Sequence, residues 1–245
     1  FVENLKAREK FCMTASEKQI YCFKKPERRH IVQNIFAQDA FSLYVKGDSN
    51  DVHIRSSLYQ PAQFHYIVKR TKLDDVVEKV KNGTKQIMVE SYAGNGKTCF
   101  LKCLACILAD NGYDVYVYNR FYETLKSEIE HICSNDNGKT VFIVDNFSHS
   151  REMLSELELF RKGETIIVAD RTLSCDVSYE WLYRKFGDFE SFDLDTLDEK
   201  ELRQIVDIFD KYGFFGKHAS MRLDQKLEYL RTDCKSTMRD ILLDL

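Results

Sequence analysis

The chain has 245 residues, of which 44% are hydrophobic and 31% are charged, and its formal net charge is −3. This composition is typical of a folded globular protein, and the charge balance provides no long-range attraction to nucleic acid or anionic lipid. Neither is therefore an expected partner. No run of about 18 apolar residues occurs, which excludes a membrane-spanning helix.

Residues 1–63 carry no motif that points to a function. Apolar residues are frequent enough for ordered structure, but their spacing mixes the helical and strand periods. We expect a region of unknown role, which could be the tail of a preceding effector domain, a linker subdomain or a regulator. The chain starts without Met and stops on an apolar helical pattern, so we expect a fragment of a longer polypeptide.

Residues 64–195 alternate short apolar runs with helical patterns. The runs are rich in Val, Ile, Tyr and Phe and are bounded by polar or turn residues, which predicts strands buried on both faces of a parallel sheet. The predicted strands are 86–90, 113–118, 140–145, 165–170 and 191–194, and the predicted helices are 73–81, 98–111, 122–133, 151–160 and 178–186. This order predicts an α/β fold, a three-layer sandwich with a mostly parallel five-stranded sheet.

Residues 196–245 contain helical patterns only, over 196–212, 222–231 and 236–245. Thr196 is the predicted N-cap of the first helix, and Glu199, three residues later, completes a capping-box pattern. We expect a small helical domain appended to the sheet, and we call residues 196–245 the lid.

Eight cysteines are present, and three of them share one predicted helix face. Cys99, Cys103 and Cys106 follow the spacing i, i+4, i+7, and no second Cys-x-x-Cys or nearby His completes a metal set. We interpret them as core residues with free thiols, which fits a reducing, cytoplasmic location.

The segment Ser91-Tyr92-Ala93-Gly94-Asn95-Gly96-Lys97-Thr98 is the strongest functional signal. It matches the phosphate-binding pattern G-x-x-x-x-G-K-[ST], with Ser91 at the position of the first glycine, and it lies between a predicted strand and a predicted helix. Backbone N–H groups of such a loop and of the following helix surround phosphate oxygens, while the lysine contacts the β- and γ-phosphates. The predicted nucleotide-binding residues are Ala93, Gly94, Asn95, Gly96, Lys97, Thr98 and Cys99.

A second signal is the apolar run 140–144 that ends in Asp145. An acidic residue at the end of a buried strand beside a phosphate loop can hold Mg²⁺, together with the loop hydroxyl. Thr98 and Asp145 are therefore the predicted metal ligands, with ATP and Mg²⁺ as the expected cofactors. Asn146 follows Asp145 and can orient a water molecule, although it cannot accept a proton.

Two further segments resemble motifs of the STAND NTPases. Residues 66–70, Tyr-Ile-Val-Lys-Arg, are similar to the hhGRE motif of that family, and residues 166–171, Ile-Ile-Val-Ala-Asp-Arg, resemble its strand ending in arginine. The resemblance covers residues 64–245 and implies that Arg70 seats the nucleotide and Arg171 senses the γ-phosphate. It also implies an AAA-type lid and the strand order of the additional-strand class, with the fourth strand between the loop strand and the strand of Asp145.

The chain also departs from the STAND pattern. Lys69 and Thr71 replace the Gly and Glu of hhGRE, and Asn146 stands where a second acid is frequent. The Gly-x-Pro motif of the lid is missing, because neither proline lies beyond residue 61. The resemblance therefore supports nucleotide binding more strongly than hydrolysis.

Two functions follow from the sequence. The first is a slow ATPase that acts as a nucleotide-controlled switch in signalling or defence, with Lys97, Asp145, Asn146 and Arg171 as catalytic residues. Such a switch is expected to oligomerise or to dock on flanking effector and sensor domains. The second is a scaffold that keeps ATP or ADP as a structural ligand without hydrolysing it. An AAA-like remodeller of nucleic acid would need basic pore loops, and none is visible in the sequence.

Overall fold

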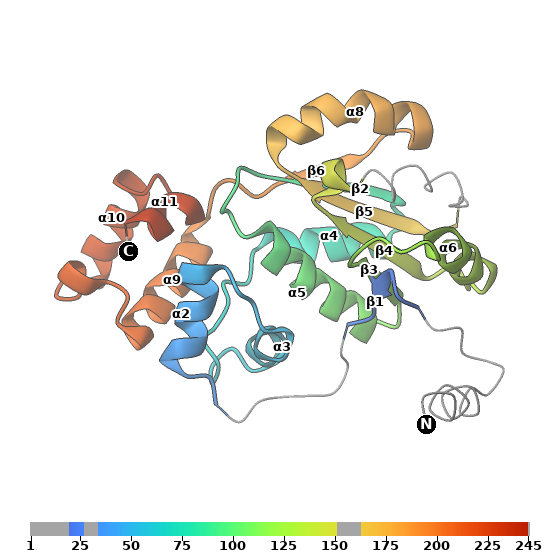
Figure 1. Ribbon diagram of the computed structural model, residues 1–245. Coiled ribbons are helices and arrows are strands. Elements are labelled where there is room, and N and C mark those ends of the chain that lie inside the picture. The colour runs from blue at the N-terminus through green and yellow to red at the C-terminus, as the bar shows by residue number, and fades with distance from the viewer. Residues whose placement is uncertain (1–19, 27–33, 151–162, 245) are drawn as a thin grey trace, which may run out of the picture.

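A computed structural model describes residues 20–26, 34–150 and 163–244 of the chain. Its centre is a six-stranded sheet in the order β1-β3-β4-β5-β2-β6 (Figure 1). All neighbouring strands are parallel except β1, which is antiparallel to β3. The strands are β1 (Phe23–Lys24), β2 (Gln86–Glu90), β3 (Asp114–Tyr118), β4 (Thr140–Asp145), β5 (Thr165–Asp170) and β6 (Glu190–Asp193).

The mostly parallel sheet confirms the predicted fold class, with one strand more than expected. All six residues of β5 are buried, as expected for a central strand covered on both faces. This strand lies between β2 and β4, which confirms the order of the additional-strand class. The extra strand, β1, has two residues and lies in the region for which no fold was predicted.

Helices cover both faces of the sheet, as the alternating pattern predicts. The apolar faces of α4 (Lys72–Lys81) and α5 (Lys97–Asp110) share one hydrophobic cluster with inward side chains of the strands. On the opposite face, α6 (Leu125–Ser134) and α8 (Thr172–Phe186) contribute to a second cluster (Figure 1). The helix α8 begins six residues earlier than predicted, and the predicted helix 151–160 lies outside the described residues.

The lid contains α9 (Glu199–Tyr212), α10 (Leu223–Thr232) and α11 (Met238–Leu243) around a third hydrophobic cluster. The predicted N-cap of α9 was wrong. Asp198 is the cap: its side chain accepts the backbone N–H of Glu201, and the Glu201 carboxylate accepts the backbone N–H of Asp198. The sequence holds two overlapping capping boxes, and Asp caps a helix as well as Thr does.

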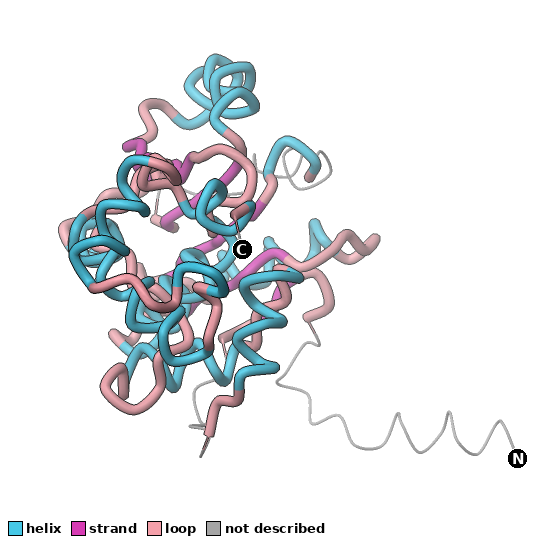
Figure 2. Tube along the Cα trace, turned by 90° about the vertical axis from the view of Figure 1, so that its left-hand side faces the viewer, coloured by secondary structure: helices cyan, strands magenta, loops and turns pink. Residues whose placement is uncertain are grey.

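The N-terminal region contributes two helices that the mixed periodicity did not reveal, α2 (Ala37–Lys46) and α3 (Asp51–Tyr59). Ala40 and Tyr44 of α2 belong to the hydrophobic cluster of the lid, whereas Ile54 of α3 packs into the cluster around α5. In the view from the lid side, the lid helices and these two helices lie in front of the sheet (Figure 2). Residues far upstream of the lid are thus part of its packing.

Candidate functional site

The phosphate-binding loop connects β2 to α5 at the carboxyl edge of the sheet. Gly94 and Gly96 have φ angles of +90° and +85°, which L side chains rarely adopt, so glycine is required at both positions. Ser91 is not among the described non-glycine residues with positive φ, which explains why serine is tolerated there. Its backbone continues the pairing with β5, because Ser91 N donates to Asp170 O and Thr172 N donates to Ser91 O.

The Lys97 side chain turns back into this loop and is 8% exposed. Its ammonium donates to Ser91 O at 2.7 Å, to Ser91 Oγ at 2.9 Å and to Tyr92 O at 3.1 Å. Burial lowers the pKa of the Lys97 ammonium, while the carboxylates of Asp145 and Asp170 oppose this shift. Oxygen atoms of the loop thus hold the Lys97 ammonium at its centre.

The two predicted metal ligands lie in direct contact. Thr98, in the first turn of α5, donates its hydroxyl to Asp145 Oδ2 at 2.6 Å, and Asp145 Oδ1 accepts the N–H of Asn146 at 2.9 Å. Thr98 is exposed and Asp145 partly exposed, so both oxygens are accessible to a ligand. A hydroxyl and a carboxylate are suitable for Mg²⁺, which takes few protein oxygens and completes its shell with phosphate and water. The residues therefore fit this ion.

A cavity of about 1010 Å³ joins the loop, the ends of the strands, α2 and the lid. Every predicted site residue lines it: Arg70, Ala93, Gly94, Asn95, Gly96, Lys97, Thr98, Cys99, Asp145, Asn146 and Arg171. The structure therefore brings these residues together around one space. Asn146 adopts a left-handed backbone conformation with φ 49°, which Asn tolerates better than most residues.

The cavity also has an apolar wall that the sequence did not reveal. Its side chains come from α2, from the segment ahead of α4 and from α11: Phe41, Leu43, Val45, Ile67, Val68, Met238 and Leu242. An apolar wall and a polar loop in one cavity suit a ligand with a flat base at one end and phosphates at the other. No local pattern could have identified these residues, because they meet only when the lid and α2 pack together.

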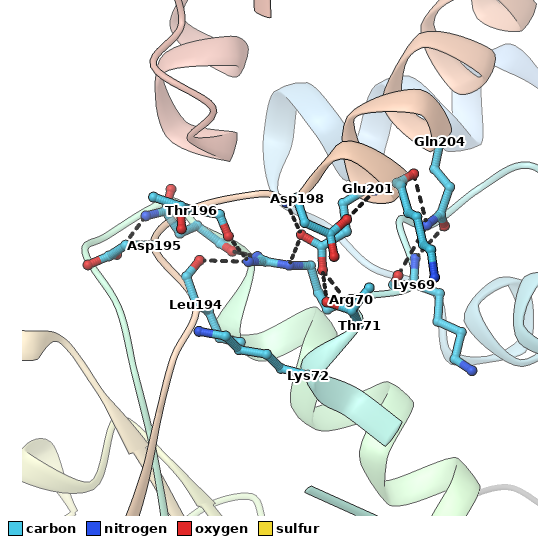
Figure 3. A network of polar contacts seen from close by, with 12 residues as sticks. Lys69, Arg70, Thr71, Lys72, Leu194, Asp195, Thr196, Asp198, Glu201 and Gln204 are labelled. Carbon is cyan, nitrogen blue, oxygen red and sulfur yellow. Dashed lines mark hydrogen bonds and ion pairs between the residues drawn. The ribbon is translucent and has the colours of Figure 1, made fainter. Parts of the chain in front are cut away.

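Arg70 lies at the junction between the loop, the sheet and the lid (Figure 3). Its guanidinium donates to Leu194 O at 2.9 Å, to Thr196 O at 2.8 Å and to Asn95 O at 3.4 Å. Arg70 Nε lies 3.1 Å from Glu201 Oε2 in an ion pair without hydrogen-bond alignment, and both side chains are buried. Arg70 thus lines the cavity while its charge is balanced by a carboxylate of the lid.

At the end of β5, Asp170 and Arg171 have different surroundings. Asp170 is 1% exposed, and its two oxygens accept the N–H groups of Ser148 and Arg171 at 2.7 Å each. That carboxylate therefore holds the strand end and the turn after β4. Arg171 is exposed, and its position in the cavity wall is compatible with contact to a phosphate.

The parallel sheet, the inserted fifth strand and the glycine-lined loop with its lysine together define a P-loop NTPase of the AAA-related, additional-strand class. A family model described as Novel STAND NTPase 5 matches residues 58–183, just over half of the chain. The chain belongs to this family, which confirms the resemblance seen in the sequence. It is accordingly a nucleotide-binding NTPase module.

Similar solved structures include a closed-state reconstruction of Hsp104 with ATPγS and FITC-casein and an Hsp104–ADP complex from S. cerevisiae. Each has a TM-score of 0.49 and 12% sequence identity, and the alignments cover 78% of this chain. The chain spans only 39% and 38% of those two chains. No curated protein sequence matches it. Among the described helices, none has the length and hydropathy needed to cross a bilayer.

Proposed function

We propose that this NTPase module is a nucleotide-controlled switch, in which ATP bound with Mg²⁺ sets the position of the lid relative to the sheet. The observation that carries the proposal is the junction at Arg70. One buried guanidinium contacts the phosphate loop at Asn95 O, the sheet-to-lid connection at Leu194 O, and the lid helix α9 at Glu201. A change in the loop is therefore mechanically connected to the lid.

The side chains at the cavity divide the binding task between them. Lys97 and the loop N–H groups bind the β- and γ-phosphates, and Arg171 approaches the γ-phosphate from the end of β5. Arg70 stabilises the loop through its hydrogen bond to Asn95 O. Thr98 and Asp145 hold the Mg²⁺, which when bound neutralises phosphate charge and orients the γ-phosphate. The apolar wall formed by α2, the segment ahead of α4 and α11 covers the base.

Hydrolysis in this site would be slow. Water must attack the γ-phosphorus in line with the leaving oxygen while Lys97 and Arg171 stabilise the charge on the phosphate oxygens. Asn146 can orient that water through its side-chain amide, but it cannot take the proton. Asp170 already accepts two backbone N–H groups, so its carboxylate has less capacity to act as a base.

The second candidate, a scaffold with a permanently bound nucleotide, is favoured by Asn146 alone. A single-turnover measurement of phosphate release from Mg·ATP separates the two. The switch with ATPase activity predicts release by the wild-type chain that is lost in Lys97→Ala. Equal release by both proteins, at the rate of the buffer, would favour the scaffold.

The wider arrangement belongs to the same proposal. We assign residues 64–195 to the NTPase core and residues 196–245 to the lid, while residues 1–63 keep an unknown role. Within residues 1–63, α2 packs on the lid cluster and α3 packs on the cluster around α5. As a STAND-type switch in signalling or defence, the module would act in the cytoplasm, either by oligomerising or by docking on flanking effector and sensor domains.

Asp145→Asn provides a test of the metal site. We expect this change to weaken nucleotide binding in Mg²⁺ by about tenfold, because a neutral amide oxygen is a poorer ligand for a hard cation than a carboxylate. In EDTA, the variant and the wild type should bind ATP equally. Titration of a fluorescent ATP analogue with and without Mg²⁺ measures both values.

Asp114→Asn is the matched control, since Asp114 lies at the opposite end of the neighbouring strand β3 and pairs with Lys25. Its Mg²⁺ dependence should equal that of the wild type. If Asp145→Asn retained the full effect of Mg²⁺, Asp145 would not be a metal ligand.

A further inference from the structure

The side chain of Asn95, inside the phosphate loop, contacts two other parts of the chain. Its amide Nδ2 donates to Asp195 Oδ1 at 2.8 Å, and its Oδ1 accepts the backbone N–H of Arg239 at 3.0 Å. Asp195 Oδ1 also accepts the N–H of Tyr92 at 2.6 Å. Asn95 is 2% exposed, so these bonds are shielded from water.

The partners of Asn95 lie just ahead of the lid and in its last helix. Asp195 lies in the sheet-to-lid connection, which follows the end of β6 at Asp193, and Arg239 lies in the first turn of α11, the last helix of the lid. Backbone N–H groups in a first helical turn have no partner within the helix, so Arg239 N–H needs an outside acceptor. The phosphate loop supplies it.

A second contact joins the same two elements. A Cβ atom placed on Gly94 would lie 3.4 Å from both Cβ and Cγ of Arg239, which shows that α11 packs directly on the loop. The position of Asn95 in the motif accepts any residue, so binding of phosphate by itself does not require an asparagine there. The hydrogen bonds of the Asn95 side chain therefore serve to connect the loop to Asp195 and to α11.

We propose that Asn95 is a positioning residue that transmits the shape of the phosphate loop to the lid. The inference deepens the proposed switch and rests on it. When the loop N–H groups turn toward phosphate oxygens, Asn95 moves with its backbone. Its amide then shifts the Asp195 carboxylate just ahead of the lid and the Arg239 N–H in the last helix of the lid. The same movement displaces Asn95 O, the acceptor of a hydrogen bond from Arg70.

The chemistry of this junction requires an amide, because one partner accepts a hydrogen bond and the other donates one. In Asn95→Asp the donor is lost, and two carboxylates would stand 2.8 Å apart, where like charges repel. Asp195→Asn keeps an oxygen that can accept from Tyr92 N and from Asn95 Nδ2. The double variant Asn95→Asp/Asp195→Asn reverses the direction of the bond, since the amide at position 195 now donates to the carboxylate at position 95.

Hydrogen exchange of peptides covering residues 237–243, followed by mass spectrometry on the 245-residue chain, tests the inference. Without nucleotide, we expect Asn95→Asp to accelerate exchange there by about five- to tenfold, the effect of losing one hydrogen bond and its packing. Asp195→Asn should stay close to wild type, and the double variant should recover most of the protection. Mg·ATP should change this exchange in the wild type.

Asn111→Asp is the matched control, because it makes the same change at the far end of α5, where Asn111 Nδ2 donates to Ile107 O. It should leave exchange at 237–243 unchanged. The inference is overturned if Asn95→Asp exchanges like the wild type, or if the double variant is no better protected than Asn95→Asp. If Mg·ATP did not change hydrogen exchange at residues 237–243 of the wild type, the proposed switch would be overturned instead. The comparison of variants without nucleotide would still decide whether Asn95 holds α11.

Discussion

Lys97→Ala is expected to weaken binding of Mg·ATP by about ten- to a hundredfold. Hydrogen bonds from a charged donor contribute about 1.5–3 kcal/mol each, and the Lys97 ammonium is the cation at the centre of the loop. Phosphate oxygens carry more negative charge than the carbonyl oxygens that hold it in the structure, so the exchange toward phosphate is favourable. Competition between ATP and a fluorescent analogue gives the two dissociation constants.

The control is Lys102→Ala, in the same helix. Lys102 also has oxygen partners, an ion pair with Asp51 at 2.6 Å and a hydrogen bond to Ser49 O, but its own side chain does not line the cavity. Its loss should leave nucleotide binding unchanged. Equal binding by Lys97→Ala and the wild type would show that the loop does not hold the phosphates, and the proposed function would fail with it.

The strands and the loop could be predicted from sequence because their signals are local. Three predicted strands, β2, β4 and β5, agree with the structure at both ends, since each is an apolar run between polar residues. The phosphate loop is recognisable because its residues are adjacent in the chain. Its glycines are needed for positive φ angles, and its lysine is needed for contact with phosphate. The stripe of α5 was predictable for the same reason at Cys103 and Cys106, which are buried, whereas Cys99 is only partly buried and lines the cavity. The seven cysteines in the described part of the chain are free thiols.

The contacts that connect the loop to the lid could not be predicted, because they join residues far apart in the chain. Arg70 and Glu201 are separated by 131 positions, and Asn95 and Arg239 by 144. The sequence shows an arginine in a family-like motif but not the acid that balances it. Similarly, the apolar wall of α2 follows no clear period, because one side packs on the lid and the other lines the cavity.

Glu201→Gln is expected to have the largest effect on stability, a loss of about 3–5 kcal/mol of unfolding free energy. Glu201 is 2% exposed, and besides the ion pair with Arg70 its carboxylate accepts the N–H of Thr71 at 2.7 Å and that of Asp198 at 3.1 Å. Removing its charge leaves the Arg70 guanidinium buried beside a neutral amide. Urea unfolding followed by circular dichroism measures the loss.

Glu199→Gln is the matched control, two residues away in the same helix turn. Glu199 pairs with Arg203 and Arg231 on the exposed side of α9, where water screens charges, so its effect should be far smaller. A loss for Glu201→Gln no larger than that for Glu199→Gln would show that the buried pair does not hold the lid.

A double-mutant cycle separates the charge from the hydrogen bonds. If the cost of Glu201→Gln comes from the uncompensated guanidinium, Arg70→Gln/Glu201→Gln should lose about 1–3 kcal/mol less than the sum of the two single variants. Additive losses would instead assign the cost to the bonds with Thr71 and Asp198. Only the first result makes the lid sensitive to charge near Arg70, and phosphate arriving at the loop beside Asn95 brings such charge. The cycle therefore shows whether the charge of Arg70 contributes to holding the lid, which the proposed response to nucleotide requires.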